Sequence, residues 1–242
     1  MFSIVDMKYS TLFFSVLTTL ATMSTAQTNI TIEPFKLSAP PGTDIWRKAP
    51  SHNAFNASTH PVQPPTYDLK TFQRAKLTFT LPSADQLRQY DQAGILLHIT
   101  KRGVPDNQTK WIKSGIEFYQ GKPYVATVGC DAWADWSLVP MPDFTSESHN
   151  KSRPGATIEA RRERDALGKS MWIYWITRDE QGKEVGKLPI REVNWVFADE
   201  EGWSIGITGY VCRPTKLSES GDEELLEAEF VEGLEIGILK DE

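Results

Sequence analysis

The chain has 242 residues, of which 40% are hydrophobic and 24% charged, and its formal net charge is −6. This composition is typical of a globular protein and argues against intrinsic disorder. The acidic balance also argues against a nucleic-acid-binding protein, because such proteins need basic surfaces to displace counterions from phosphates.

The first 26 residues predict a secretory signal peptide. Lys8 precedes an uncharged apolar run, residues 11–26 (TLFFSVLTTLATMSTA), which ends in small residues. The run is shorter than the roughly 20 residues that span a bilayer, and its end predicts cleavage after Ala26. We therefore expect residues 27–242 to form one secreted domain, with no membrane contact after cleavage.

Four sequons follow the signal peptide, and their acceptor residues are Asn29, Asn56, Asn107 and Asn150. In a secreted chain, such motifs predict N-linked glycans on surface loops.

Short strands separated by turns dominate the rest of the chain. Residues 27–70 are rich in Pro, Thr, Ser and Asn and predict an irregular lead-in with short strands. Residues 83–89 predict one or two helical turns. Strands are predicted at 74–81, 93–99, 111–119, 123–130, 157–164, 171–178, 191–198, 203–212 and 227–238. This all-β pattern predicts a single antiparallel β-sandwich or jelly roll.

The cysteines and the C-terminal acids leave structural alternatives open. Cys130 and Cys212 each close a predicted strand, so they are either a disulfide or two buried thiols. Two cysteines and four scattered histidines give no zinc-type spacing, so we expect no metal. Residues 219–242 carry ten acidic residues against one lysine, which predicts a solvated edge.

Several strands pair an aliphatic face with a mixed one, because successive strand residues point to opposite sides. In 111–119 the aliphatic face carries Ile112, Ile116 and Phe118, and the mixed face carries Trp111, Lys113 and Glu117. We expect the aliphatic faces to form the core. The mixed faces predict a ligand groove, and the alternative is a solvated surface with scattered aromatics.

Candidate functional residues follow from these mixed faces and from nearby loops. Glu117 is either a general acid or base or a salt-bridge partner of Lys113. The candidate catalytic residues are Lys113, Glu117 and His98. The candidate ligand-binding residues are Trp46, Asn53, Gln92, Trp111, Trp133, Asp135, Trp136, Trp172 and Tyr174. The strands that carry the mixed faces hold no tight Glu/Asp cluster, which argues against glycoside hydrolysis.

Several short motifs together resemble a large family of unknown function with a concanavalin-A-like sandwich fold, which includes fungal "regulation of enolase" proteins. These motifs are residues 44–48 (DIWRK), 55–57 (FNA), 90–94 (YDQAG), 113–117 (KSGIE), 135–137 (DWS) and 209–214 (GYVCRP). The resemblance spans about residues 42–215 and implies a jelly roll with its ligand on the concave sheet. It implies no settled activity.

Three functions are compatible with these patterns. The first is a cofactor-free cyclase of the hetero-Diels–Alder type for a hydrophobic small molecule, similar in size and β-rich character to secreted proteins of fungal secondary-metabolite pathways. Such chemistry needs a shaped apolar pocket and a polarising group, and no cofactor. The second is a lectin in which Asp135, Asn53 and Gln92 bind sugar hydroxyls. The third is a non-enzymatic regulatory protein.

Overall fold

The computed structural model describes residues 27–141, 152–179, 181–218 and 223–240. The predicted signal peptide and the sequon at Asn150 lie outside the described residues. Within the described ranges, no helix is long and apolar enough to cross a membrane.

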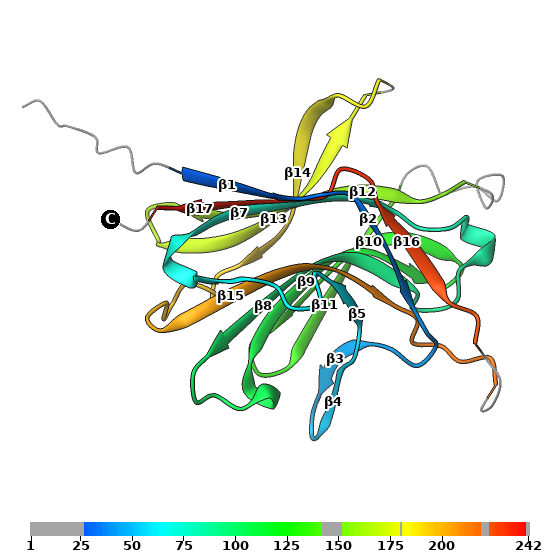
Figure 1. Cartoon of the computed structure of the whole chain (residues 1–242), viewed down its shortest axis with the longest axis horizontal. Helices are drawn as coiled ribbons and strands as arrows, with labels where there is room; N and C mark the ends of the chain where they lie inside the picture. The colour runs from blue at the N-terminus through cyan, green and yellow to red at the C-terminus, as the bar shows by residue number, and fades with distance from the viewer. Residues whose placement is uncertain (1–26, 142–151, 180, 219–222, 241–242) are drawn as a thin grey trace, which may run out of the picture.

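Two antiparallel sheets stack face to face (Figure 1). In the eight-stranded sheet, six strands lie side by side and β16 (Leu226–Phe230) and β2 (Phe35–Ala39) extend it. The six strands, in spatial order, are β1 (Gln27–Ile32), β17 (Leu234–Leu239), β7 (Phe72–Thr80), β12 (Gly155–Arg164), β13 (Lys169–Arg178) and β14 (Glu184–Val193). The predicted all-β, antiparallel sandwich is confirmed.

The second sheet has seven strands. Its strands, in spatial order, are β11 (Ala134–Pro140), β10 (Lys122–Cys130), β9 (Lys110–Tyr119), β8 (Gln92–Lys101), β15 (Trp203–Cys212) and β5 (Ser58–His60), with β6 (Thr66–Asp68) also paired to β15. Three short 3₁₀ helices, η1 (Leu69–Thr71), η2 (Ala84–Gln86) and η3 (Asp106–Gln108), lie in the connections. A separate hairpin, β3 (Ile45–Lys48) and β4 (His52–Phe55), lies on the far side of this sheet from the core (Figure 1).

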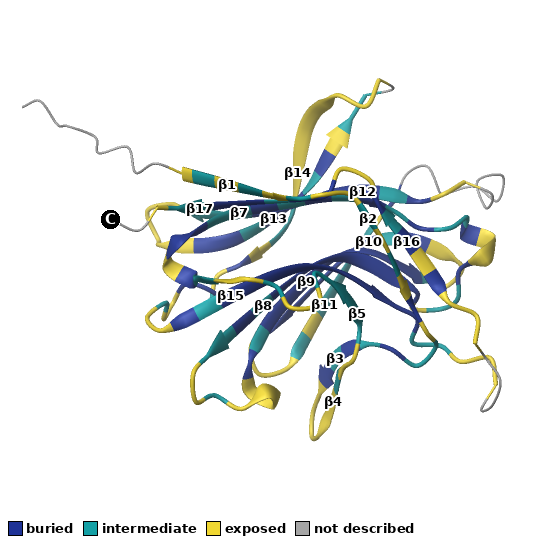
Figure 2. Cartoon of the chain, viewed as in Figure 1, coloured by how far each residue is buried: buried dark blue, intermediate teal, exposed yellow. Residues whose placement is uncertain are grey.

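The core fills the space between the two sheets, as the alternation predicts. Ile95, Leu97, Ile112, Ile116 and Ile173 are all completely buried there. A second apolar cluster lies between the seven-stranded sheet and the β3–β4 hairpin. It contains Ile45, Leu96, Trp111, Val128, Cys130, Tyr210 and Cys212. Both faces of the seven-stranded sheet are therefore largely buried, as Figure 2 shows.

Two predicted strands were wrong in detail. Residues 194–199 form turns, and Val196 and Phe197 pack into the core from a loop rather than from a strand. The paired strand here is β14, an edge strand that accommodates Pro189 because one side of it needs no hydrogen-bonding partner. The predicted final strand is two strands, because Gly233 adopts a φ of +73° and turns the chain between β16 and β17.

The acidic C-terminal region is not merely a solvated edge. Its acids in β16 and β17 and in the turn between them pair with bases elsewhere in the eight-stranded sheet: Glu229 with Lys36 at 3.0 Å, Glu235 with Arg74 at 3.0 Å, and Glu232 with Arg178 at 2.6 Å. β17 lies between β1 and β7, so this region is an integral part of the sandwich.

The two cysteines are free thiols. Cys130 lies on β10 and Cys212 on β15, with β9 and β8 between them. Burial raises the pKa of Cys130 to about 11 and that of Cys212 further, so both act as small apolar residues of the second cluster.

Candidate functional site

A pocket opens where the β3–β4 hairpin meets the outer face of the seven-stranded sheet. It has a volume of about 320 Å³, within the usual range for small-molecule sites. We name it the Glu117 pocket, and its lining residues are Asp44, Trp46, Lys48, Tyr90, Gln92, Lys113, Glu117 and Trp136.

A pair of glycines makes room for the polar floor of the Glu117 pocket. In the register of β8 and β9, Gly94 lies opposite Gly115, with Gln92 opposite Glu117 on one side and Leu96 opposite Lys113 on the other. A Cβ on Gly115 would lie 2.0 Å from the carbonyl oxygen of Ala93 and 2.6 Å from the Cα of Gly94. Only glycine fits at these two positions, and their bare backbone leaves space above the sheet.

Lys113 uses this space to reach the far side of the pocket. Its Nζ donates a hydrogen bond to Oε1 of Gln92 at 2.6 Å and lies 3.7 Å from Oδ1 of Asp44. The side-chain amide nitrogen Nε2 of Gln92 donates a hydrogen bond to the backbone carbonyl of Tyr90 at 3.2 Å. Lys113 is therefore held by Asp44 and Gln92. Its salt bridge with Glu117, which was the alternative to an acid–base role, does not form.

Glu117 is a buried carboxyl group with a raised pKa. Only 7% of the residue is exposed, and burial raises its pKa to about 7. Attraction to Lys113 lowers the pKa of Glu117, and repulsion from Asp44 raises it further. A carboxyl group with a pKa near neutrality can both donate and accept a proton at physiological pH, as a general acid or base must.

Aromatic rings form the walls of the Glu117 pocket. Tyr90 lies 5.8 Å from Tyr119, and Tyr119 meets Trp136 edge-on at 5.2 Å. The indole Nε1 of Trp136 is buried without a well-formed hydrogen bond, although its N–H is close enough to Glu117 to lower the pKa of that carboxyl slightly. This N–H is therefore an unsatisfied donor beside Glu117 in the wall of the pocket.

Two side chains outside the sheet shape the entrance. Tyr90 has a φ of +69° and is held by a hydrogen bond from its backbone N–H to the carbonyl of Phe118 at 2.7 Å. The backbone N–H of Asp44 donates to Oδ1 of Asn56 at 2.8 Å, which fixes the loop that carries Asp44. Asn56 is itself exposed and does not line the pocket, so a glycan on it is compatible with an open site.

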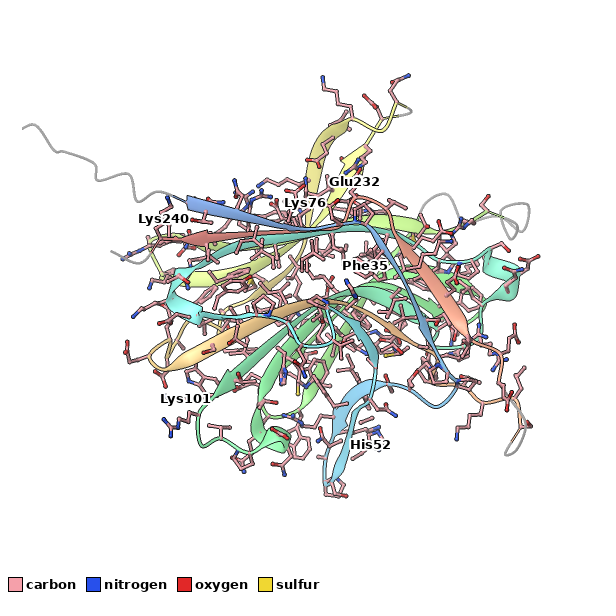
Figure 3. The ribbon with its side chains drawn as sticks, viewed as in Figure 1. Phe35, His52, Lys76, Lys101, Glu232 and Lys240 are labelled. Atoms are coloured by element: carbon pink, nitrogen blue, oxygen red, sulfur yellow. The ribbon has the colours of Figure 1, made fainter. Side chains whose placement is uncertain are left out.

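A second pocket, of about 470 Å³, lies at the other end of the hairpin. We name it the Trp133 pocket, and it is lined by Arg47, Pro50, Ser51, His52, Asn53, Asn107, Gln108, Lys110, Asp131, Ala132 and Trp133. Figure 3 marks His52, which lies on the hairpin below the sheet. Among the described residues, no three His, Cys, Asp or Glu side chains gather as a possible metal site.

A family model described as "Protein of unknown function (DUF1349)" matches residues 22–230. The chain belongs to this family. An uncharacterized protein of Emericella nidulans is 43% identical over 188 residues, which cover 78% of this chain and 80% of that protein. The description of the family gives no activity.

Solved structures similar to this DUF1349 chain are remote in sequence. A functionally unknown protein from Saccharomyces cerevisiae is 14% identical with a TM-score of 0.48, and the match covers 88% of this chain and 93% of that one. A glycoside hydrolase family protein from Mycobacterium thermorestibile is 10% identical with a TM-score of 0.43, covering 84% and 76%. A β-1,3-1,4-glucanase from a mouse hindgut metagenome is 10% identical with a TM-score of 0.36, covering 83% and 78%.

The structure divides the predicted site residues among several places. It brings together five of them in the Glu117 pocket: Trp46, Gln92, Lys113, Glu117 and Trp136. Asn53 and Trp133 lie in the Trp133 pocket. Asp135 lies on edge strand β11 and pairs with Arg191 of β14, so the three residues assigned to sugar hydroxyls do not share one site.

The remaining four candidates line neither pocket, although one continuous groove was predicted. They are Trp111, His98, Trp172 and Tyr174. Trp111 is completely buried under the hairpin. His98 lies opposite Trp111 on β8, with its ring 4.8 Å from that of Phe55 and tilted by 41° to it. It shares a hydrogen bond of 3.0 Å with Thr109, and burial lowers its pKa. Trp172 and Tyr174 stack on each other at 6.1 Å on the eight-stranded sheet, away from both pockets.

Sequence reasoning missed Asp44, Lys48 and Tyr90. The alternation rule applies only within a strand, and Asp44 and Tyr90 lie just before β3 and β8. A signal was nevertheless present, because Asp44 opens the motif at 44–48 and Tyr90 opens the motif at 90–94.

Proposed function

We propose that this protein is a secreted catalyst that binds a small ring-containing molecule in the Glu117 pocket and moves a proton with Glu117. The observation that carries the proposal is a buried carboxyl group with a pKa of about 7 at the floor of an aromatic-walled pocket. Strongly shifted pKa values in clefts are typical of functional sites, although ion-pair networks also produce them. Burial is the largest cause of the raised pKa of Glu117, and attraction to Lys113 acts in the opposite direction.

The lining suggests the chemistry of the ligand. Trp46 and Trp136 offer flat apolar contact, while Gln92, Asp44 and Glu117 offer hydrogen bonds along one edge. A neutral molecule with an apolar ring face and a carbonyl or hydroxyl edge satisfies both. Protonated Glu117 would polarise the carbonyl oxygen.

A cyclisation is the finer hypothesis within this proposal. Ionised Glu117 would remove a proton from the carbon next to the carbonyl of a conjugated, unsaturated substrate. The resulting dienolate would add to a second double bond of the same molecule, held close by the walls, and the π bond of that acceptor would break as the ring closes. Protonated Glu117 would return the proton to the cyclised product. No atom is gained or lost, so substrate and product have the same mass, as in a hetero-Diels–Alder reaction.

Deletion of the gene, followed by complementation, tests the proposal. We expect the deletion strain to accumulate an isomer of the missing product, with equal mass and different chromatographic retention. Complementation with the wild type or with Trp172→Ala should restore the product, whereas Glu117→Gln should fail although the protein is secreted in equal amount. An unchanged metabolite profile in the deletion strain would contradict the proposal.

Sugar binding is the second candidate, and the acid and amide groups of the Glu117 pocket favour it, because aromatic rings with neighbouring carboxylates suit a pyranose. Tryptophan fluorescence titrated with cellobiose distinguishes the two functions. Saturable quenching that Trp136→Phe abolishes and Trp133→Phe retains would favour a lectin without turnover. A regulatory role would instead require a macromolecular partner, and neither the deletion nor the titration would then show a small-molecule effect.

A further inference from the structure

The Trp133 pocket is built from three loops that meet at one end of the seven-stranded sheet. They are the turn of the β3–β4 hairpin, the β8–β9 connection with η3, and the β10–β11 turn that carries Trp133. Trp133 is 47% exposed, an unusual state for so large an apolar side chain. It has no assigned role in the proton-transfer site described above.

A predicted glycosylation site opens into this pocket. Asn107 lines it and is exposed in η3. The third residue of its sequon, Thr109, is buried and makes hydrogen bonds to its neighbours. The Thr109 hydroxyl donates to the carbonyl of Asp106 at 2.8 Å, and the Thr109 carbonyl accepts from the guanidinium of Arg47 at 2.9 Å. The position of Asn107 relative to Trp133 is therefore fixed by the hydrogen bonds of its neighbours.

We propose that the N-linked glycan on Asn107 folds back into the Trp133 pocket and that its first two N-acetylglucosamine residues stack on Trp133. This inference requires entry into the secretory pathway, and it is independent of the chemistry proposed for Glu117. The glycan is the occupant because its attachment point is part of the pocket wall.

The polar lining matches the groups of an N-acetylglucosamine unit. The apolar face of the sugar ring would cover the exposed indole of Trp133. Asn53 accepts a hydrogen bond from Nε of Arg47 at 2.9 Å through Oδ1, which leaves its Nδ2 to donate to a hydroxyl or an acetamide oxygen. Lys110 and Asp131 pair at 2.6 Å across the opposite side and hold that side in place.

The covalent tether makes even a weak contact effective. A single sugar stacked on an indole binds a free ligand only weakly, but a short flexible tether supplies an effective concentration in the millimolar range. At an effective concentration of about twice the dissociation constant, the tethered sugar would occupy the pocket about two thirds of the time, which corresponds to about threefold protection. A soluble sugar at lower concentration would not displace it.

Site-resolved deglycosylation tests the inference. The full chain is secreted from a host that adds high-mannose glycans, and glycan occupancy at Asn107 is measured by peptide mass spectrometry. Endoglycosidase H, which cuts between the first two N-acetylglucosamine residues, is then applied to the native protein. We expect the Asn107 glycan to be cut about threefold more slowly than in Trp133→Ala, with the Asn29 glycan unaffected. Trp172→Ala is the matched tryptophan control and should change neither rate.

A second readout follows the protein instead of the sugar. Hydroxyl-radical oxidation of Trp133 should rise about threefold in Asn107→Gln, because the glycan no longer covers the indole. Equal cleavage rates in the wild type and Trp133→Ala, unchanged oxidation of Trp133, or an unoccupied Asn107 in the secreted protein would each overturn the inference. None of these results would bear on Glu117, since the deletion experiment tests that site separately.

Discussion

At the scale of single residues, burial separates the tryptophans that shape the Glu117 pocket from those that hold the sheet. Trp111 is completely buried in the second apolar cluster, whereas Trp136 is half-buried at a pocket wall. Trp111→Ala should lower the free energy of unfolding by about 3–5 kcal/mol, because it leaves a cavity. Trp136→Ala should cost less than half of that amount and should abolish ligand binding. Denaturant unfolding compares the two, and equal losses of stability would contradict the assignment of Trp136 to a wall.

The pKa of Glu117 predicts an unusual pH dependence of stability. Because the pKa in the folded protein, about 7, lies above the ordinary value of 4.5, the folded state holds more protons than the unfolded chain between these two pH values. The associated stability is present below pH 4.5 and is lost as the pH rises through 7. Its size is about 3 kcal/mol.

Replacement of Glu117 should remove this dependence. Glu117→Gln should be more stable than the wild type at pH 8 by up to about 3 kcal/mol and similar to it at pH 5. The exposed Glu201→Gln is the control and should follow the wild type at both pH values. A wild-type protein whose stability rises between pH 5 and 8 in parallel with Glu117→Gln would contradict a buried, unpaired carboxyl group.

At the scale of elements, the close approach of β8 and β9 decides whether the pocket exists. Gly115→Ala would push a methyl group into the backbone of β8, so we expect a loss of about 3 kcal/mol and displacement of Lys113. Gly129→Ala is the matched control on neighbouring β10, where the nearest atoms lie 3.7 Å away and are side chains. It should change the stability by less than about 1 kcal/mol. If thermal unfolding showed an equally small loss of stability for Gly115→Ala, this result would contradict the close approach of β8 and β9.

The elements also show what alternation in the sequence can and cannot predict. Ile95, Leu97, Ile112, Ile116 and Ile173 face the core as predicted, because a strand with one apolar face has only one favourable orientation. The same alternation also predicted that the mixed faces of the strands form one continuous groove. It could not show that the β3–β4 hairpin covers the middle of that face, since the hairpin and the sheet are far apart in the sequence.

The placement of Trp172 and Tyr174 has a similar cause. Their strand has the same alternation as β8 and β9, but it belongs to the other sheet. Which sheet a strand joins depends on long-range pairing, and a local pattern does not encode it. The polar contacts of Lys113 with Asp44 and Gln92 depend on long-range pairing in the same way.

At the scale of the whole molecule, one buried ion pair joins the segments around the entrance of the Glu117 pocket. The guanidinium of Arg213 donates to Asp91 at 2.8 and 3.2 Å, to the carbonyl of Gln86 at 3.3 Å and to the carbonyl of Glu224 at 3.0 Å. Both Arg213 and Asp91 are at most 2% exposed. They link β15 to the start of β8, next to Tyr90, and to the C-terminal region.

Removal of one partner should therefore be costly. Asp91→Asn should lower the free energy of unfolding by about 3–5 kcal/mol, because the Arg213 charge stays buried without its counter-ion. Asp135→Asn breaks the pair with Arg191, in which the Asp135 side chain is 76% exposed, and should cost less than about 1 kcal/mol. Chemical denaturation of both variants checks the contrast, and a small effect of Asp91→Asn would show that the pair does not hold the entrance together.

Direct titration of Glu117 tests the central claim that the pocket holds a proton-transfer group. The carboxyl carbon would be followed by ¹³C nuclear magnetic resonance from pH 3 to 9 in protein labelled at glutamate, with Glu117→Gln identifying the signal. We predict a midpoint near pH 7, as burial in the pocket requires. A midpoint near the ordinary value of 4.5 would mean that water or a cation neutralises the cost of burial, and the acid–base role of Glu117 would then be contradicted.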